Sequence, residues 1–134
     1  MQSNTAEFKA VQRTELWQED QPWQHQPVSL VRIANLELEP ETLSVRAGDD
    51  SVELTANEYD VLMALIQRHD RVVSRNALFE QVWGGVFPRS TRMIDTYVQR
   101  IRQKLNALAP DTVYIHTHTG IGYRFSPVQS NESN

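Results

Sequence analysis

Residues 91–108 restrict the possible folds of this chain more than any other segment. Four apolar residues recur there at every third or fourth position, namely Ile94, Val98, Ile101 and Leu105. On a helix they fall within about 60° of one another, so they predict an amphipathic helix that buries one narrow stripe. The opposite side is polar and largely basic: it carries Arg92, Thr96, Gln99 and Gln103, with Asp95 and Arg102 on one shoulder and Arg100 on the other. Such a helix needs a small apolar scaffold and turns its other face to water or to a partner.

Two shorter helices are expected before it. Thr55-Ala56-Asn57-Glu58 matches a capping box, which predicts a helix that runs to about Arg68. Ser74 can cap a second helix over 75–83, and Gly84 directly follows as its stop. The sequence therefore predicts three helices in close succession.

Short β-rich pieces flank the helices on both sides. Before them lie Val28–Ile33, Leu36–Leu38, Leu43–Val45 and Val52–Leu54, interrupted by Pro40 and by a turn at 47–50. After them lie Val113–Thr117 and Tyr123–Phe125, joined by a turn that contains Gly120 and Gly122. The first group predicts an antiparallel sheet with one solvated face, and the second predicts a hairpin. The order predicts an α+β fold, a winged helix-turn-helix with an N-terminal antiparallel sheet, three helices and a C-terminal β-hairpin wing.

The remaining segments have the composition of linkers. Residues 1–27 contain six glutamines, two prolines and no sustained apolar period, which is typical of a flexible interdomain linker. Trp17 and Trp23 are exceptions, since side chains of this size favour packing against something. We expect one domain at 28–127 and a disordered polar tail at 128–134.

Several classes of protein are disfavoured by what the sequence lacks. No apolar run approaches the roughly 18 residues that cross a bilayer, and the first residues do not resemble a secretory signal, so we expect a cytoplasmic protein without a membrane partner. The absence of cysteine excludes disulfides, thiolate zinc sites and a cysteine nucleophile. No phosphate-binding glycine loop, serine nucleophile elbow or His-Glu-x-x-His motif is present. We expect no catalysis and no cofactor.

Charge is unevenly distributed along the chain. Residues 1–59 hold eleven acids and four bases, a local charge of −7, whereas residues 60–126 hold five acids and nine bases, a local charge of +4; with Glu132 the net charge is −4. Such asymmetry indicates either a polyanion-binding surface or a solvated basic helix face. The 91–108 helix is compatible with both: arginine and glutamine suit guanine and adenine edges in a major groove, and Arg102 and Lys104 suit the neighbouring phosphates.

Five motifs occur in an order and spacing that match a known family. They are LTANEY at 54–59, VSRNAL at 73–78, VWG at 82–84, IDTYVQRIRQKL at 94–105 and GIGYRF at 120–125. Together they resemble the C-terminal winged-helix effector domain of OmpR/PhoB-type response regulators, over Val28 to Phe125. The resemblance implies sequence-specific binding of double-stranded DNA by a bacterial transcription factor of a two-component system.

The resemblance also assigns roles to single residues. Arg100 and Asp95 match base-contacting positions, and Thr96 and Gln99 share their helix face. Phosphate-holding positions of the family are matched by Trp83, Arg92, Tyr97, Arg102, Thr117 and Tyr123, to which we add Lys104 for its place on the helix. The recognition helix at about 91–108 is expected in the major groove.

The wing, residues 116–125, is expected at the adjacent minor groove, where His118, Thr119, Gly120 and Arg124 form its candidate contact residues. Thr119 stands where many family members carry an arginine, and Gln99 where some carry another. We therefore expect weaker minor-groove readout and weaker phosphate affinity.

Further partners follow from the resemblance alone. The loop Gly84, Gly85, Val86, Phe87, Pro88 and Arg89 matches the segment that approaches RNA polymerase in the family. A receiver domain, which these residues do not contain, is expected in the full-length protein. Through it the protein would be phosphorylated by a cognate histidine kinase and would form a homodimer.

Other interpretations remain open from the residues themselves. His116 and His118 lie on one face of a predicted strand, a spacing that a metal-assisted hydrolase could use, but Asp111, the nearest acid in sequence, has no reason to point there. The acidic N-terminal sheet could instead be the functional face of a protein interaction module. Trp83 could equally be a core residue. Tyr123 and Phe125 are expected to be core residues first and contact residues second, because alternate strand positions face inward.

Asp95 also has an alternative to base contact, since it could pair within its own helix with Arg92 or Gln99.

Overall fold

The computed structural model describes residues 12–16, 28–84 and 92–130. The chain divides into two compact units, Met1–Glu53 and Leu54–Asn134. The boundary falls inside the segment 28–127, which the sequence predicts as one domain.

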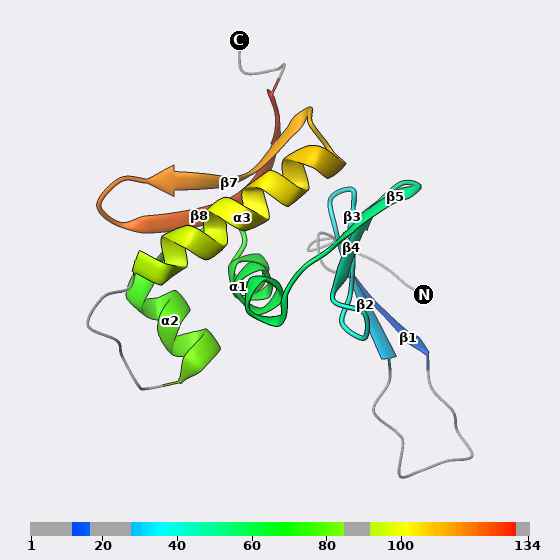
Figure 1. The fold of residues 1–134 in the computed structure, drawn as a ribbon, viewed down its shortest axis with the longest axis horizontal. Helices are drawn as coiled ribbons and strands as arrows, with labels where there is room; N and C mark the ends of the chain where they lie inside the picture. Colours follow the sequence, from blue (N-terminus) through cyan, green and yellow to red (C-terminus); the bar gives the residue numbers. More distant parts are fainter. Residues whose placement is uncertain (1–11, 17–27, 85–91, 131–134) are drawn as a thin grey trace. The chain divides into compact units, whose positions relative to one another are not determined.

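The first unit is an antiparallel sheet of five strands. These are β1 Gln12–Leu16, β2 Val28–Ile33, β3 Leu36–Glu39, β4 Ser44–Ala47 and β5 Asp50–Glu53, and each pairs with the next in chain order (Figure 1). Leu36, Leu38 and Val45 are buried, whereas Glu37 and Glu39 between them are partly exposed. This alternation gives the predicted sheet its apolar face and its acidic face.

Strand β1 corrects the prediction of a continuous linker over 1–27. Its five residues pair in register with β2, from Gln12 opposite Arg32 to Leu16 opposite Val28. A glutamine-rich composition does not reveal this strand, because its order comes from backbone pairing with a distant segment. The rest of the predicted linker, 1–11 and 17–27, lies outside the described residues.

The second unit combines three helices with a three-stranded sheet. The helices are α1 Ala56–Gln67, α2 Arg75–Trp83 and α3 Arg92–Leu108, and the strands are β6 Val72–Ser74, β7 Thr112–His118 and β8 Gly122–Gln129. The strand order is β6-β8-β7, with every pair antiparallel. Figure 1 shows α3 lying along the β7–β8 hairpin. The predicted winged helix-turn-helix is present, and the short strand β6 adds a third strand to the expected hairpin.

Strand β8 is longer than the sequence predicts. It continues to Gln129, which lies opposite Thr112, and Val128 lies opposite Val113. The Ser130 amide then donates to Asp111 O at 2.7 Å. The prediction of a disordered tail is therefore wrong for 128–130, where strand pairing supplies backbone partners that polar composition conceals. Residues 131–134 lie outside the description.

Helix boundaries follow the predicted caps. Thr55 Oγ1 accepts from the Glu58 amide at 3.2 Å, and Glu58 Oε1 accepts from the Thr55 amide at 3.0 Å. Ser74 Oγ accepts from the Ala77 amide at 3.0 Å at the start of α2. Gly84 ends α2 with a φ of 84°, a conformation that glycine adopts without steric cost. The caps at Thr55 and Ser74 and the stop at Gly84 thus set where α1 and α2 begin and where α2 ends.

The predicted stripe of α3 is buried. Ile94, Val98 and Ile101 are 0% exposed and Leu105 is 2% exposed. They belong to the apolar core of the second unit, which also contains Leu62, Leu65, Ile66, Leu78 and Phe125. Of the helices in the described part of the chain, none is both long and apolar enough to span a bilayer.

Candidate nucleic-acid interface

Burial of the apolar stripe leaves the opposite face of α3 exposed. Arg92, Thr96, Gln99, Arg100 and Gln103 all lie on this surface, which we call the α3 face. Arg100 makes no hydrogen bond or ion pair with any residue that the structure describes. The α3 face therefore presents cationic and amide groups to solvent, on the side of the helix that the sequence predicts to be exposed.

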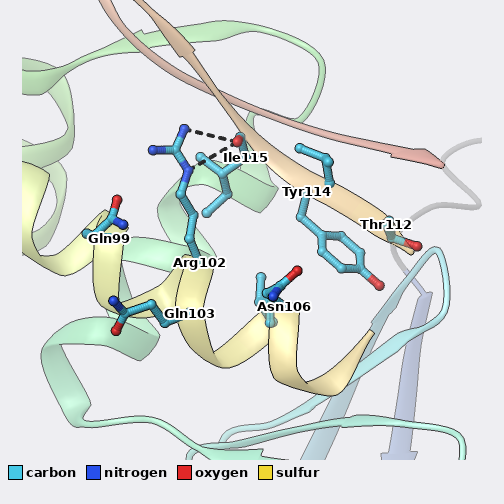
Figure 2. A pocket seen from close by; sticks show the side chains of 9 residues that line it. Gln99, Arg102, Gln103, Asn106, Thr112, Tyr114 and Ile115 are labelled. Carbon is cyan, nitrogen blue, oxygen red and sulfur yellow. Dashed lines mark hydrogen bonds between the residues drawn. The ribbon is translucent and has the colours of Figure 1, made fainter. Parts of the chain in front are cut away.

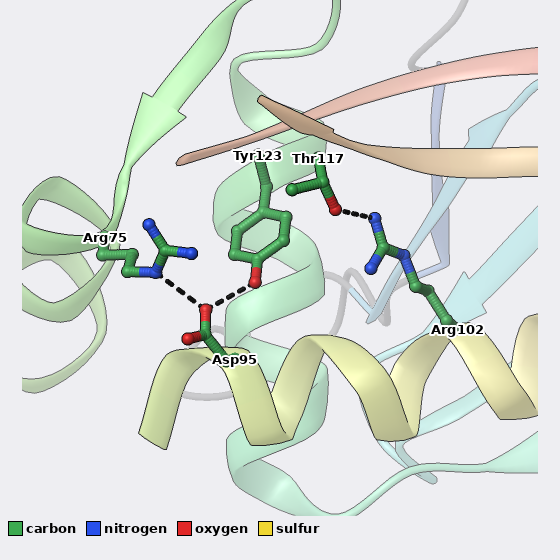
Figure 3. Close-up of polar contacts among 5 residues, drawn as sticks. All are labelled: Arg75, Asp95, Arg102, Thr117 and Tyr123. Atoms are coloured by element: carbon green, nitrogen blue, oxygen red, sulfur yellow. Dashed lines mark hydrogen bonds and ion pairs between the residues drawn. The ribbon is translucent and has the colours of Figure 1, made fainter. Parts of the chain in front are cut away.

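Asp95 joins the start of α3 to two other elements. Its Oδ1 accepts from Arg75 Nε of α2 at 2.7 Å and from the Tyr123 hydroxyl of β8 (Figure 3). These hydrogen bonds come from outside α3, and the charge of Arg92, an intrahelical partner considered from the sequence, also lowers the pKa of Asp95. The side chain is 41% exposed, and Oδ2 makes no hydrogen bond with the described residues. Oδ1 therefore joins α3 to α2 and to β8.

The electrostatics of this cluster favour the ionised carboxylate. Burial alone would favour the neutral acid, but hydrogen bonds from Tyr123 and Arg75 outweigh it, so the pKa of Asp95 lies below its ordinary value of 3.8. Burial and the same hydrogen bond raise the pKa of Tyr123 above 10.0. Tyr123 is 4% exposed, so its ring is a core side chain as the sequence allowed.

Arg102 points from α3 to the wing strand β7. Its Nε and Nη2 donate to Ile115 O at 3.3 and 3.0 Å, and Nη2 donates to Thr117 Oγ1 at 2.6 Å (Figures 2 and 3). The guanidinium also lies 5.5 Å from the centroid of the Tyr123 ring. Arg102 is therefore engaged within the fold, and a phosphate would have to share it.

Lys104 has an internal partner of its own. Its Nζ lies 2.7 Å from Oε1 of Glu58, which is the most deeply buried charged side chain in the described residues at 2% exposed. Burial opposes ionisation of Glu58, but bonds from Lys104 and the Thr55 amide hold its pKa below 4.5. The phosphate role predicted for Lys104 stays a prediction, and the ion pair with Glu58 competes with it.

Two aromatic residues, Trp83 of α2 and Tyr97 of α3, lie against each other. Trp83 stacks on Phe79 with ring centroids 5.0 Å apart, and Tyr97 lies 5.7 Å from Trp83. The Tyr97 hydroxyl accepts from Asn57 Nδ2 at 3.0 Å. Trp83 remains partly exposed, so its position is compatible with both the core role and the phosphate role considered from the sequence.

The wing ends in a turn around Gly120, whose φ is 79°. Thr119 and Gly120 are exposed, and His118 is half-buried at the end of β7. Arg124 lies on β8 away from this turn, and its Nε is buried without a hydrogen-bond partner among the described residues. Ile121 at the turn is 58% exposed, a position that the sequence reasoning did not single out.

Sequence reasoning also missed Arg75, Asn57 and Glu58 as residues that position α3. Each is joined to an α3 residue between 20 and 46 positions away. No local spacing rule reveals such partners. The charges of Arg75 and Glu58 were the available signal, because a charged side chain that becomes buried requires a partner of opposite charge.

The loop assigned to RNA polymerase is almost entirely outside the described residues. Only Gly84 is described, and Gly85, Val86, Phe87, Pro88 and Arg89 are not.

The histidine pair considered as a metal site has an internal contact. His116 Nε2 donates to Ser126 O at 2.7 Å. Within the described segments, no group of three or more histidines and acids could hold a metal ion.

A groove of about 310 Å³ lies beside the α3 face. Gln99, Gln103 and Asn106 of α3 form one wall, and Thr112 and Ile115 of β7 contribute to the other (Figure 2).

Comparison with known proteins places these features in a family. Residues 49–125 match the family described as "Transcriptional regulatory protein, C terminal". The chain is similar to the DNA-binding response regulator MtrA of Mycobacterium tuberculosis, with 32% identity over 102 residues that cover 76% of this chain and 45% of MtrA. It is 34% identical to the transcriptional regulatory protein SrrA of Staphylococcus aureus over 104 residues, covering 77% of this chain and 43% of SrrA. The chain thus spans less than half the length of these relatives.

Solved structures give the same picture. The Klebsiella pneumoniae RstA DNA-binding domain, in complex with the RstA box, is similar with a TM-score of 0.62 and 26% identity, covering 72% of this chain and 96% of that chain. The DNA-binding domain of the response regulator AdeR, in complex with an intercistronic region, is similar with a TM-score of 0.60 and 25% identity. The match covers 69% of this chain and 95% of that chain.

Proposed function

The chain belongs to the transcriptional regulatory protein C-terminal family of the OmpR/PhoB type, and on this premise we propose that it is a sequence-specific effector domain for duplex DNA. The α3 face is the observation that carries the proposal. Its exposed arginine and amide groups lie on a rigid helix, and a helix fits the width of the major groove. The family is one of transcription regulators and not of enzymes.

Base recognition is assigned to the first half of the α3 face. Arg100 can donate two hydrogen bonds to O6 and N7 of a guanine, and Gln99 can pair with an adenine edge. Thr96 lies on the same exposed face. The free Oδ2 of Asp95 can accept a hydrogen bond from a cytosine amino group, while Oδ1 keeps its internal partners.

Phosphate contacts are assigned first to side chains with exposed atoms near the start of α3. Arg92 is exposed and Trp83 at the end of α2 is partly exposed, and they are the first candidates. Tyr97, Arg102 and Thr117 can contact phosphate only with the atoms that their internal bonds leave available. For Lys104 and Tyr123, we propose a positioning role, because their polar groups bind Glu58 and Asp95.

The wing is proposed to lie at the adjacent minor groove, with His118, Thr119 and Gly120 near the sugar–phosphate backbone. Arg124 is assigned a supporting role, since its Nε is buried. No arginine occurs at the wing turn 118–122, so this contact is expected to add less affinity than the major-groove contact.

The partners of the whole protein belong to the same proposal. Because the chain spans less than half of its curated relatives, we propose that a longer protein supplies a receiver domain. Phosphorylation of that receiver by a histidine kinase, and its homodimerisation, would bring two effector domains onto DNA in the bacterial cytoplasm. The loop 84–90 is the proposed contact with RNA polymerase.

Selection of bound fragments from random duplexes, followed by affinity titration against salt, tests the proposal. We expect one enriched sequence, with log affinity falling by about 0.9 per log unit of salt for each phosphate neutralised. Arg92→Ala combined with Arg100→Ala should abolish binding, and Arg68→Ala combined with Arg71→Ala is the matched control, because both pairs are exposed arginines. If the Arg68/Arg71 variant lost as much DNA affinity as the Arg92/Arg100 variant, an interface on α3 would be contradicted.

The acidic face of the β1–β5 sheet supports a second candidate, a protein interaction module. Glu37 and Glu39 of β3 are partly exposed on this face, and Glu53 of β5 is exposed on the same side. This candidate would replace the first if selection enriches no duplex sequence and if both pairs of arginine substitutions change the affinity for DNA equally.

A further inference from the structure

A single guanidinium joins the proposed recognition helix to the wing. Arg102 of α3 hydrogen bonds to the backbone of Ile115 and to the hydroxyl of Thr117, both on β7. It also lies against the ring of Tyr123 on β8. Arg75 of α2 lies 5.3 Å from the centroid of the same ring, and Figure 3 shows the two arginines on either side of it.

The position of β7 explains why such a link is needed. β7 is the edge of the sheet order β6-β8-β7, so its outward carbonyls have no strand partner. Arg102 satisfies the carbonyl of Ile115. Beyond this point, the 310 Å³ groove separates the second half of α3 from the start of β7. Arg102 therefore acts where packing between helix and edge strand is incomplete (Figure 2).

We propose that Arg102 is a positioning residue that fixes the wing relative to α3 through Thr117, so that minor-groove and major-groove contacts form together. This proposal rests on the proposed function. A planar guanidinium can hold the carbonyl and the hydroxyl in one fixed geometry, which a lysine ammonium cannot reproduce. The wing would otherwise lose part of its binding free energy in becoming ordered on DNA.

Thr117→Val tests this role on DNA, and a proton-exchange measurement made without DNA distinguishes it from the loss of a contact between Thr117 and phosphate. It removes the acceptor for Arg102 Nη2 while keeping side-chain size, and it leaves every arginine in place. Thr112→Val is the matched control, because Thr112 lies on the same strand and its hydroxyl makes no hydrogen bond with the described residues. Arg102→Lys provides a second variant that keeps the charge.

Affinity is measured for two duplexes that share the selected site. One extends beneath the wing, and the other ends before those base pairs. For the long duplex, Thr117→Val and Arg102→Lys should each weaken binding about five- to tenfold. For the short duplex, Thr117→Val should change affinity less than twofold, and Thr112→Val should have no effect on either.

Equal weakening on both duplexes would overturn the positioning role, because it would mean that Thr117 acts on stability or on the major-groove contact. No weakening on the long duplex would overturn it as well. If the wild-type chain prefers no sequence in either length, the proposed function itself fails, and this result is distinct from the other two.

A measurement without DNA tests the link directly. The Arg102 Nε proton should exchange with water more slowly than that of exposed Arg100, and Thr117→Val should accelerate it, in the free chain observed by NMR. Equal exchange of the two arginines would overturn the proposal whatever the DNA titrations give.

Discussion

The ammonium of Lys104 lies 2.7 Å from the carboxylate of Glu58, which is 2% exposed. The same carboxylate oxygen accepts from the Thr55 amide and so completes the capping box of α1. One side chain therefore begins the first helix and anchors the second half of α3. This ion pair holds α3 in place one helical turn from Arg100, whose charge also lowers the pKa of Glu58.

Lys104→Met should destabilise the fold by about 2 kcal/mol, because it leaves a buried carboxylate without its cation. The loss should be smaller than for a fully buried pair, since the Lys104 side chain is 33% exposed. Urea unfolding measures this, with Gln103→Met on the exposed face as the control, expected to change stability by less than about 0.5 kcal/mol. A similar small change for both variants would contradict the importance of the ion pair.

The ionisation of Glu58 predicts a pH dependence. Its pKa is lowered in the folded state, so its contribution to stability is complete above the ordinary value of 4.5 and is lost as pH falls through the folded pKa. The wild type should exceed Glu58→Gln in unfolding free energy by about 2 kcal/mol at pH 6. The difference should shrink steadily below pH 4.5. Other carboxylates titrate in both proteins, so their effects cancel in the difference between the two unfolding free energies. A difference that stays constant with pH would therefore contradict this role of Glu58.

Arg100→Ala should relax specificity at one base pair and cost about 1 to 3 kcal/mol there. Arg92→Ala should instead weaken binding to all sequences alike, because phosphates carry no sequence information. Titration of each variant against a panel of sites with single base-pair changes separates the two effects. Identical loss on every site for both variants would show that the proposed division between base and phosphate contacts is wrong.

Gly122→Ala should prevent normal packing of the wing. A Cβ at this position would overlap the Val73 carbonyl oxygen and lie 2.8 Å from Cα of Ser74, so strand β6 would have to move. We expect a loss of about 3 kcal/mol or more. Gly120→Ala meets no atom within 4 Å and should cost only about 1 to 2 kcal/mol for its positive φ. Thermal unfolding of the two variants provides the comparison.

The predictable parts of the fold are those set by neighbours in sequence. The capping box at Thr55 and the buried stripe of α3 depend on residues three or four positions apart, and both were predicted correctly. Strands β1 and β6 were not predicted, because their order comes from backbone pairing with distant segments. The N-terminal strand lies in a glutamine-rich segment whose composition indicates a linker.

The candidate site shows the same division. The side chains of the α3 face could be identified from helical periodicity alone. The partners of Asp95, Arg102 and Lys104 could not, because Arg75, Thr117 and Glu58 come from other elements. Polar residues on one helix can either contact a ligand or hold the helix in place, and only the three-dimensional arrangement distinguishes these uses.

The surface that meets DNA can be mapped most directly by NMR titration of the labelled chain with its selected duplex. The largest amide shifts should fall on residues 92–103 of α3 and on 117–122 at the wing turn. Shifts confined to the acidic strands at 36–53, with α3 unchanged, would contradict an interface on α3.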